Sequence, residues 1–90
     1  MTPETKPEID KTVRAVLGDV LALSPAQVAR FTDATPLFGS LPELDSMAVA
    51  GVLTELEDRL GLTIEDDEVD GDMLATFGAL TTFLAAKALF

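Results

Sequence analysis

The sequence of 90 residues contains no cysteine and no histidine. Without cysteine there is no disulfide framework and no thiolate of the chain's own, and without histidine no side chain ordinarily shuttles protons near neutral pH. These absences exclude Ser-His and Cys-His nucleophilic sites and the usual zinc sites. A chain of this length also has too small a core to enclose a deep cleft. We therefore expect a non-catalytic protein.

Basic residues are scarce as well. Six Lys and Arg against sixteen Asp and Glu give a net charge of −10, which repels nucleic acid and anionic membrane surfaces. Natural partners are expected to carry basic patches. No apolar run approaches the roughly 20 residues that span a bilayer, and the segment MTPETKPEIDKTV lacks the basic and apolar regions of a signal peptide. We expect a cytoplasmic monomer without membrane insertion or a metal site.

Apolar residues repeat with helical spacing in three segments. These segments predict helices over residues 7–23, over 46–60 with Gly61 as the C′ residue, and from about residue 77 until the chain frays near Phe90. The intervening residues 24–44 hold three prolines and a glycine and are typical of a long loop, although Ser24-Pro25 allows a one-turn helix to start. The loop is expected to be pinned to the core by four apolar side chains: Phe31, Leu37, Phe38 and Leu41.

The acidic segment EDDEVDGDM, which follows the second helix, allows a short third helix or turn containing Val69, Met73 and Leu74. No pattern of period two persists. The sequence therefore predicts an all-α bundle of four helices, three longer and one short, with a long loop after the first helix. We expect a single domain over residues 1–90, ordered from about 7 to 88, with frayed termini.

The same acidic segment imitates part of a calcium-binding loop. If Gly71 is position six, position twelve is Phe77, where a bidentate Glu is required, and position three is Glu68 instead of Asp or Asn. Specific calcium binding is therefore not expected. The acidic residues are more simply explained as a solvated surface that faces a partner.

Charges on the predicted helix 46–60 favour a docking role. On a helical wheel the buried face centres on Val49 and Leu56. The opposite side carries Met47, Gly51, Thr54 and Asp58, flanked by Ala48 and Glu55. Glu55, Glu57 and Asp58 crowd the C-terminal half, where the helix dipole disfavours negative charge by about 0.3–1 kcal/mol each. Arg59 offsets only part of this cost, so a face that docks a basic partner explains the pattern better than a merely solvated one.

The pair Asp45-Ser46 precedes this helix and has two interpretations. Both residue types are preferred N-caps, so local physics favours Ser46 as a helix cap. The alternative is a chemical attachment point. No histidine exists and no Lys or Arg lies nearby in the sequence to activate the hydroxyl. If Ser46 reacts, another enzyme must activate it.

The whole pattern resembles the acyl carrier protein family over about residues 9–87. The resemblance is carried by TPLFGSL in the loop, by DSM in place of the family's usual Asp-Ser-Leu, by the helix LDSMAVAGVLTELEDRLGLTI, and by the final TFGALTTFL. It implies that a phosphopantetheinyl transferase moves 4′-phosphopantetheine from coenzyme A onto Ser46. Acyl groups would then be carried as thioesters between enzymes of lipid or polyketide biosynthesis, loaded by a ligase or acyltransferase that has a basic docking patch.

The resemblance also assigns partner contacts. It implies such contacts for Asp45, for Met47, and for the acidic Glu57 and Asp58, while Glu55 is added from the helical wheel. Ala48 and Gly51 depart from the family, since general fatty-acid carriers often have acidic residues there. This apolar first turn suggests a dedicated partner with an apolar surface flanked by basic residues. The string LPELDSMAV is also similar to stand-alone carriers found beside bacterial exopolysaccharide and exosortase systems.

Two other functions fit the sequence. One is a peptidyl or aminoacyl carrier, which shares the fold and the prosthetic group but is loaded by an adenylating enzyme. The other is an acidic helical interaction module in which Ser46 is only a cap. The aliphatic core, without Trp or Tyr, fits either a plain packed interior or one that admits an acyl chain between the helices.

Overall fold

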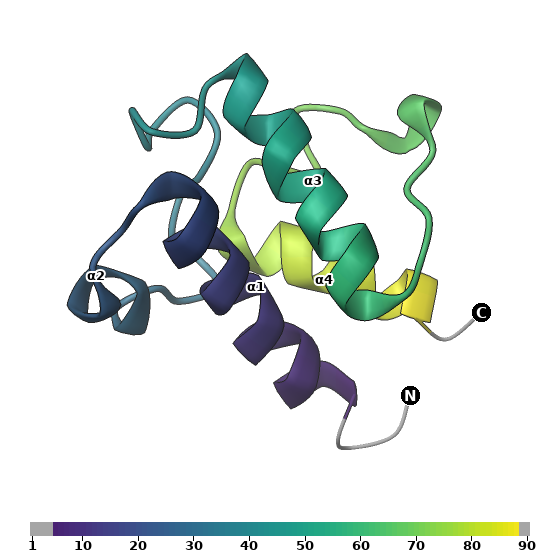
Figure 1. The fold of residues 1–90 in the computed structure, drawn as a ribbon, viewed down its shortest axis with the longest axis horizontal. Coiled ribbons are helices and arrows are strands. Elements are labelled where there is room, and N and C mark those ends of the chain that lie inside the picture. The colour runs from purple at the N-terminus through teal and green to yellow at the C-terminus, as the bar shows by residue number, and fades with distance from the viewer. Residues whose placement is uncertain (1–4, 89–90) are drawn as a thin grey trace.

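The computed structural model describes residues 5–88 and consists of helices joined by loops. The α-helices are α1 (Thr5–Leu21), α2 (Pro25–Ala29), α3 (Ser46–Leu60) and α4 (Phe77–Ala88), and one turn of 3₁₀ helix, η1, covers Asp66–Glu68. α1 packs against α2, α3 and α4. In Figure 1, α1 and α3 cross the front of the molecule and α4 lies behind them. Within residues 5–88 the β pairing is limited to one isolated bridge, between Pro36 and Thr76. The predicted all-α fold with three longer helices and one short helix is confirmed.

The short α-helix starts where Ser24-Pro25 allowed one, and not in the acidic segment after the second long helix. It is α2, inside the predicted loop, where the Ser24 hydroxyl accepts a hydrogen bond from Gln27 N at 3.1 Å and Pro25 occupies the first turn. The expected third helix is only the single turn η1, and Met73 and Leu74 lie buried in turns that follow it. The first helix ends at Leu21, two residues earlier than predicted. The predicted fraying of the termini concerns residues outside the described range.

The core is built from the apolar faces of α1, α3 and α4 together with the loop residues between them. Its largest fully buried side chains are those of Val13, Val16, Leu17, Leu37, Val52, Leu56, Phe77, Leu80, Thr81 and Leu84. In the loop, Phe31 and Leu37 are buried as predicted and Leu41 is half-buried against the core. Phe38 is not buried as predicted, and 45% of its surface is exposed. Packing in the core therefore does not account for an aromatic side chain at this position.

The loop between α2 and α3 is fastened to the segment that leads into α4. Leu37 N and Phe38 N donate to the carbonyl oxygens of Ala75 and Leu74, each at 3.0 Å. In the other direction, Phe77 N donates to Thr35 O at 2.8 Å and Gly78 N donates to Asp33 O at 2.9 Å. These backbone bonds fix the path of the loop toward the N-terminus of α3.

Arg14 connects α1 to the same loop. Its guanidinium donates to Val28 O at 2.7 Å and to Phe31 O at 2.8 Å, pairs with Asp10, and lies 4.7 Å above the ring of Phe77. The planar fork of an arginine suits two carbonyl oxygens and an aromatic face at once. Arg14 thereby ties α1 to α2 and to the start of the loop that follows it.

Candidate functional site

The N-terminus of α3 separates the roles of Asp45 and Ser46. Asp45 is the N-cap, with extended backbone (φ −91°, ψ −177°), and its Oδ1 accepts a hydrogen bond from Ala48 N at 2.8 Å. Ser46 is the first residue of the helix and is exposed. The interpretation of Ser46 as the helix cap is therefore wrong. The hydroxyl is left accessible to another molecule.

The electrostatics of this helix end suit a phosphate ester on Ser46. The first turn of α3 contains no acidic residue, and the backbone N–H groups of a helix N-terminus carry partial positive charge. An anion near these groups is stabilised by about 0.3–1 kcal/mol at an exposed site. The carboxylate of Asp45 opposes this effect, but it is already bonded to Ala48 N. An exposed hydroxyl at this end of the helix therefore fits a covalently attached phosphate.

The neighbourhood of Ser46 offers no group that would activate the hydroxyl. The sequence has no histidine, and within residues 5–88 no cluster of three or more Asp or Glu side chains is placed to hold a metal ion. The acidic segment after α3 is engaged in local structure instead, since Asp70 accepts from Met73 N at 2.8 Å and Glu68 pairs with Lys87. Among the described residues, none of these acidic side chains is thus placed to activate the Ser46 hydroxyl.

Beside Ser46 the surface of α3 is apolar. Met47 projects outward with 86% of its surface exposed, and Ala48 is half-buried. Gly51 faces α1, where an added Cβ would touch Val20 Cγ1 at 3.5 Å. Val20, on α1, is itself 36% exposed although it belongs to the apolar repeat of the first helix. The exposed apolar surface beside Ser46 thus extends from Met47 across Gly51 to Val20.

The three acidic residues predicted to dock partners differ in their surroundings. Glu55 accepts from Arg59 Nε at 2.8 Å, and Arg59 Nη2 donates to Asp19 on α1 at 2.8 Å. Hydrogen bonds to Asp19 and then to Glu55 raise the pKa of Arg59 above its usual value. Glu57 Oε2 accepts from Ile64 N at 2.9 Å and so supports the turn after α3. Asp58 is exposed, and its carboxylate makes none of these contacts.

Two hollows adjoin Ser46. One, of about 240 Å³, has apolar walls formed by Phe38, Val49, Val69 and Leu74. The other, of about 430 Å³, runs along α3 and is lined in part by Thr54, Glu57 and Asp66. They flank the exposed hydroxyl on the side of α3 that faces away from α1.

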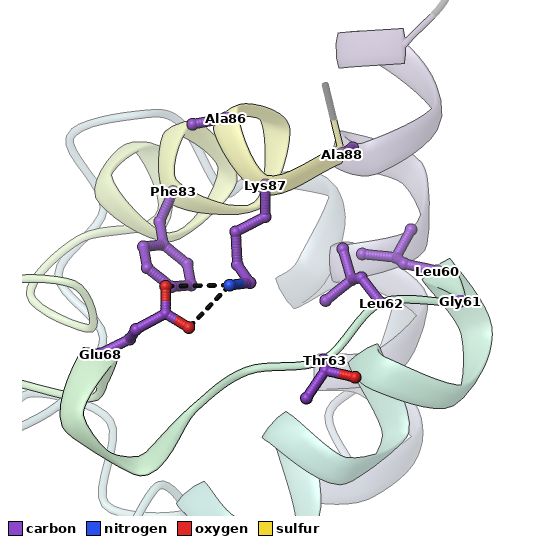
Figure 2. A pocket seen from close by; sticks show the side chains of 9 residues that line it. All are labelled: Leu60, Gly61, Leu62, Thr63, Glu68, Phe83, Ala86, Lys87 and Ala88. Carbon is purple, nitrogen blue, oxygen red and sulfur yellow. Dashed lines mark hydrogen bonds and ion pairs between the residues drawn. The ribbon is translucent and has the colours of Figure 1, made fainter. Parts of the chain in front are cut away.

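A pocket larger than these two hollows lies at the opposite end of α3, away from Ser46. Its volume is about 700 Å³ and its lining includes Leu60, Leu62, Phe83 and Lys87. Figure 2 shows Glu68 of η1 reaching across to Lys87 of α4, an ion pair of 2.7 Å, with the ring of Phe83 beside them. This pair ties η1 to α4 and explains how the short turn is held.

Comparison with known proteins identifies the family and the fold. Residues 11–84 match the family model described as phosphopantetheine attachment site. The chain belongs to this family. It is also similar to a holo acyl carrier protein from Nitrosomonas europaea, solved by solution NMR, with 35% identity and a TM-score of 0.81 over 99% of this chain and 100% of that one. No curated protein gives a significant match.

Family membership fixes the general role. The protein is a non-catalytic carrier with a phosphopantetheine prosthetic group, and carriers of this kind interact with a phosphopantetheinyl transferase and with biosynthetic enzymes. None of the helices in residues 5–88 is long and apolar enough to cross a membrane.

Proposed function

We propose that Ser46 is the attachment point and that the protein carries acyl groups as thioesters between the enzymes of a dedicated biosynthetic pathway. The observation that carries this proposal is the exposed Ser46 at the first position of α3, with Asp45 already acting as the cap. The phosphopantetheine group supplies the thiol that a chain without cysteine lacks. The chain's own contribution is to present the hydroxyl and to position the helix that partners bind.

Attachment is a phosphoryl transfer in which Ser46 is the acceptor. Its Oγ forms a bond to the phosphorus that bears pantetheine in coenzyme A, and the bond from that phosphorus to the adenosine bisphosphate portion breaks. The hydroxyl proton passes to a base of the transferase, because the sequence has no histidine to take it. The positive end of α3 favours the negative charge that remains on Ser46.

We further propose that a loading ligase or acyltransferase docks on the front of α3. Asp45, Met47, Ala48 and Gly51 border Ser46 and offer an apolar contact area, with Met47 as the projecting side chain. Of the more distant acidic residues, Glu55 and Glu57 are engaged within the chain, which leaves Asp58 as the carboxylate best placed to meet a basic group of the partner. Such a partner is mainly apolar at its centre, with basic residues at its edge.

Intact-mass measurement tests the attachment. The wild-type chain is incubated with coenzyme A, Mg²⁺ and a broad-specificity phosphopantetheinyl transferase, and we expect one phosphopantetheine increment. Ser46→Ala should show none, while Ser40→Ala, a substitution at another exposed serine, should be modified like the wild type. An unchanged wild-type mass with several transferases would refute the proposal, as would an increment that survives in Ser46→Ala.

A further inference from the structure

The apolar hollow of about 240 Å³ beside Ser46 has no role in the proposed chemistry. Its walls are Phe38 from the loop, Val49 from α3, and Val69 and Leu74 from the segment that leads to α4. In Figure 1 that segment runs back behind α3 toward the start of α4. The hollow is several times larger than the roughly 30 Å³ that a water molecule occupies in the liquid, so it can hold a small branched alkyl group.

Phe38 is the unusual wall of this hollow, because 45% of its surface is exposed while its backbone is fixed. Phe38 N donates to Leu74 O at 3.0 Å, and the preceding residue, Leu37, is fully buried. The exposed ring therefore does not result from a loosely held loop. Covering an aromatic side chain is worth about 25 cal/mol for each Å² removed from water, so the ring gains if an apolar group fills the hollow beneath it.

An occupant is available if Ser46 carries phosphopantetheine, and this inference rests on that proposed function. The first apolar group along such an arm is a carbon with two methyl groups, which is separated from the phosphate by a single methylene. The amides and the thiol lie further along. We propose that the hollow formed by Phe38, Val49, Val69 and Leu74 binds the geminal dimethyl group of the attached arm, with the ring of Phe38 as its cover.

The second hollow next to Ser46 suits these methyl groups less well. Its lining is mixed, because the carboxylates of Glu57 and Asp66 and the hydroxyl of Thr54 lie beside apolar side chains such as Leu53 and Ile64. Apolar groups gain less against such a surface than against the mainly apolar walls of the first hollow. Asp70 lines the apolar hollow, but its Oδ1 is engaged by Met73 N at 2.8 Å. The dimethyl group is thus expected beneath Phe38 and not along α3.

NMR of the holo protein tests this placement without any measurement of activity. The chain is labelled with ¹³C and ¹⁵N, modified with unlabelled coenzyme A, and examined by isotope-filtered NOE spectroscopy. We expect NOEs from both methyl groups of the arm to the ring of Phe38 and to the side chains of Val49 and Leu74. The methyl resonances should also be shifted upfield from their positions in free coenzyme A by the ring current of Phe38.

Two substitutions of Phe38 distinguish the contribution of its aromatic ring from that of the hollow. In Phe38→Leu the upfield shift should disappear while the NOEs to Val49 and Leu74 persist. In Phe38→Ala the upfield shift should also disappear, and the NOEs to Val49 and Leu74 should weaken because the hollow loses its cover. Val20→Ala, on α1, serves as the control and should change neither. NOEs to Ala50 and Thr54 instead would place the arm in the other hollow, and methyl shifts equal to those of free coenzyme A would show an unbound arm; either result overturns this inference while leaving attachment intact. A chain that takes up no phosphopantetheine at all refutes the proposed function, and the inference with it.

Discussion

Gly78, the second residue of α4, lies against Asp33 in the loop, and replacing it with alanine tests how that loop is held. An added Cβ would lie 2.8 Å from both the Cβ and the carbonyl oxygen of Asp33 and 3.0 Å from its Cα. None of these atoms is the end of a flexible side chain, so the clash is relieved only if the loop and α4 move apart. Such a movement also strains the hydrogen bond from Gly78 N to Asp33 O, which measures 2.9 Å.

The size of the effect follows from three contributions. Overpacking of this kind costs about 1–3 kcal/mol, and a weakened backbone hydrogen bond costs up to about 1 kcal/mol. Against these, alanine is more favourable than glycine in a helix by up to about 1 kcal/mol. The net loss for Gly78→Ala is about 2 kcal/mol of unfolding free energy. In a domain of this length, each kcal/mol shifts Tm by roughly 4–8 °C, so Tm should fall by roughly 8–16 °C.

Urea and thermal unfolding, followed by far-UV circular dichroism, measure this loss. Gly71→Ala is the matched control, because an added Cβ there meets nothing within 4 Å and the backbone is not in the left-handed region. Its stability should stay within about 0.5 kcal/mol of the wild type. If Gly78→Ala is as stable as Gly71→Ala, then the contact with Asp33 does not constrain the loop and the reasoning is wrong.

Three further predictions follow from the contacts described. Arg14→Met should lower the unfolding free energy by about 1–3 kcal/mol because two carbonyl oxygens lose a charged donor, and a variant as stable as the wild type in urea would contradict this. The hydrogen bond from Lys87, and then that from the Glu65 backbone, lower the pKa of Glu68 below its usual value, so Glu68 stabilises the fold above its unfolded-state pKa and this benefit is lost as pH falls through the lowered folded-state pKa. Glu68→Gln should therefore be less stable than the wild type at pH 7, and the difference in unfolding free energy should narrow as the pH is lowered into the acid range, whereas a constant difference would rule out titration of this pair. Asp58→Lys should raise the KM of the loading ligase or acyltransferase for this carrier up to about fivefold, as expected for an exposed charge pair worth about 0.2–1 kcal/mol, with unfolding unchanged; an unaltered KM would remove Asp58 from the docking surface.

The helices that form the bundle could be predicted from sequence because their apolar spacing reflects burial against one another. For the short helix α2 the sequence indicated only a possible start at Ser24-Pro25, since the helix contains no buried residue and only five residues in all. Besides the Ser24 cap, it is held by Arg14, which reaches the Val28 carbonyl oxygen from α1. Contacts of that kind join residues far apart in sequence and leave no periodic signal.

The proposed docking surface on α3 also depends on contacts between residues that a helical wheel does not include. A helical wheel places Glu57 on a solvent-facing flank, but it does not include the chain beyond the helix. Gly61 adopts a left-handed conformation (φ 66°) and turns the chain back, which brings Ile64 N within 2.9 Å of Glu57. Glu55 is similarly engaged by Arg59, which also reaches Asp19 on α1. An acidic run in the sequence thus contains fewer available carboxylates than its composition indicates.

The pair Asp45-Ser46 shows why the proposed attachment point could not be assigned from local rules. Both residues are good caps, and the preference scale does not decide between them. The choice depends on which residue is the last with extended backbone, and in the structure that residue is Asp45. Because its carboxylate bonds to Ala48 N, Ser46 is free of a capping role and stands where the helix end favours an added negative charge. A serine in the cap position would have to give up its own hydrogen bond to react, so the aspartate at position 45 is what makes the serine at position 46 available.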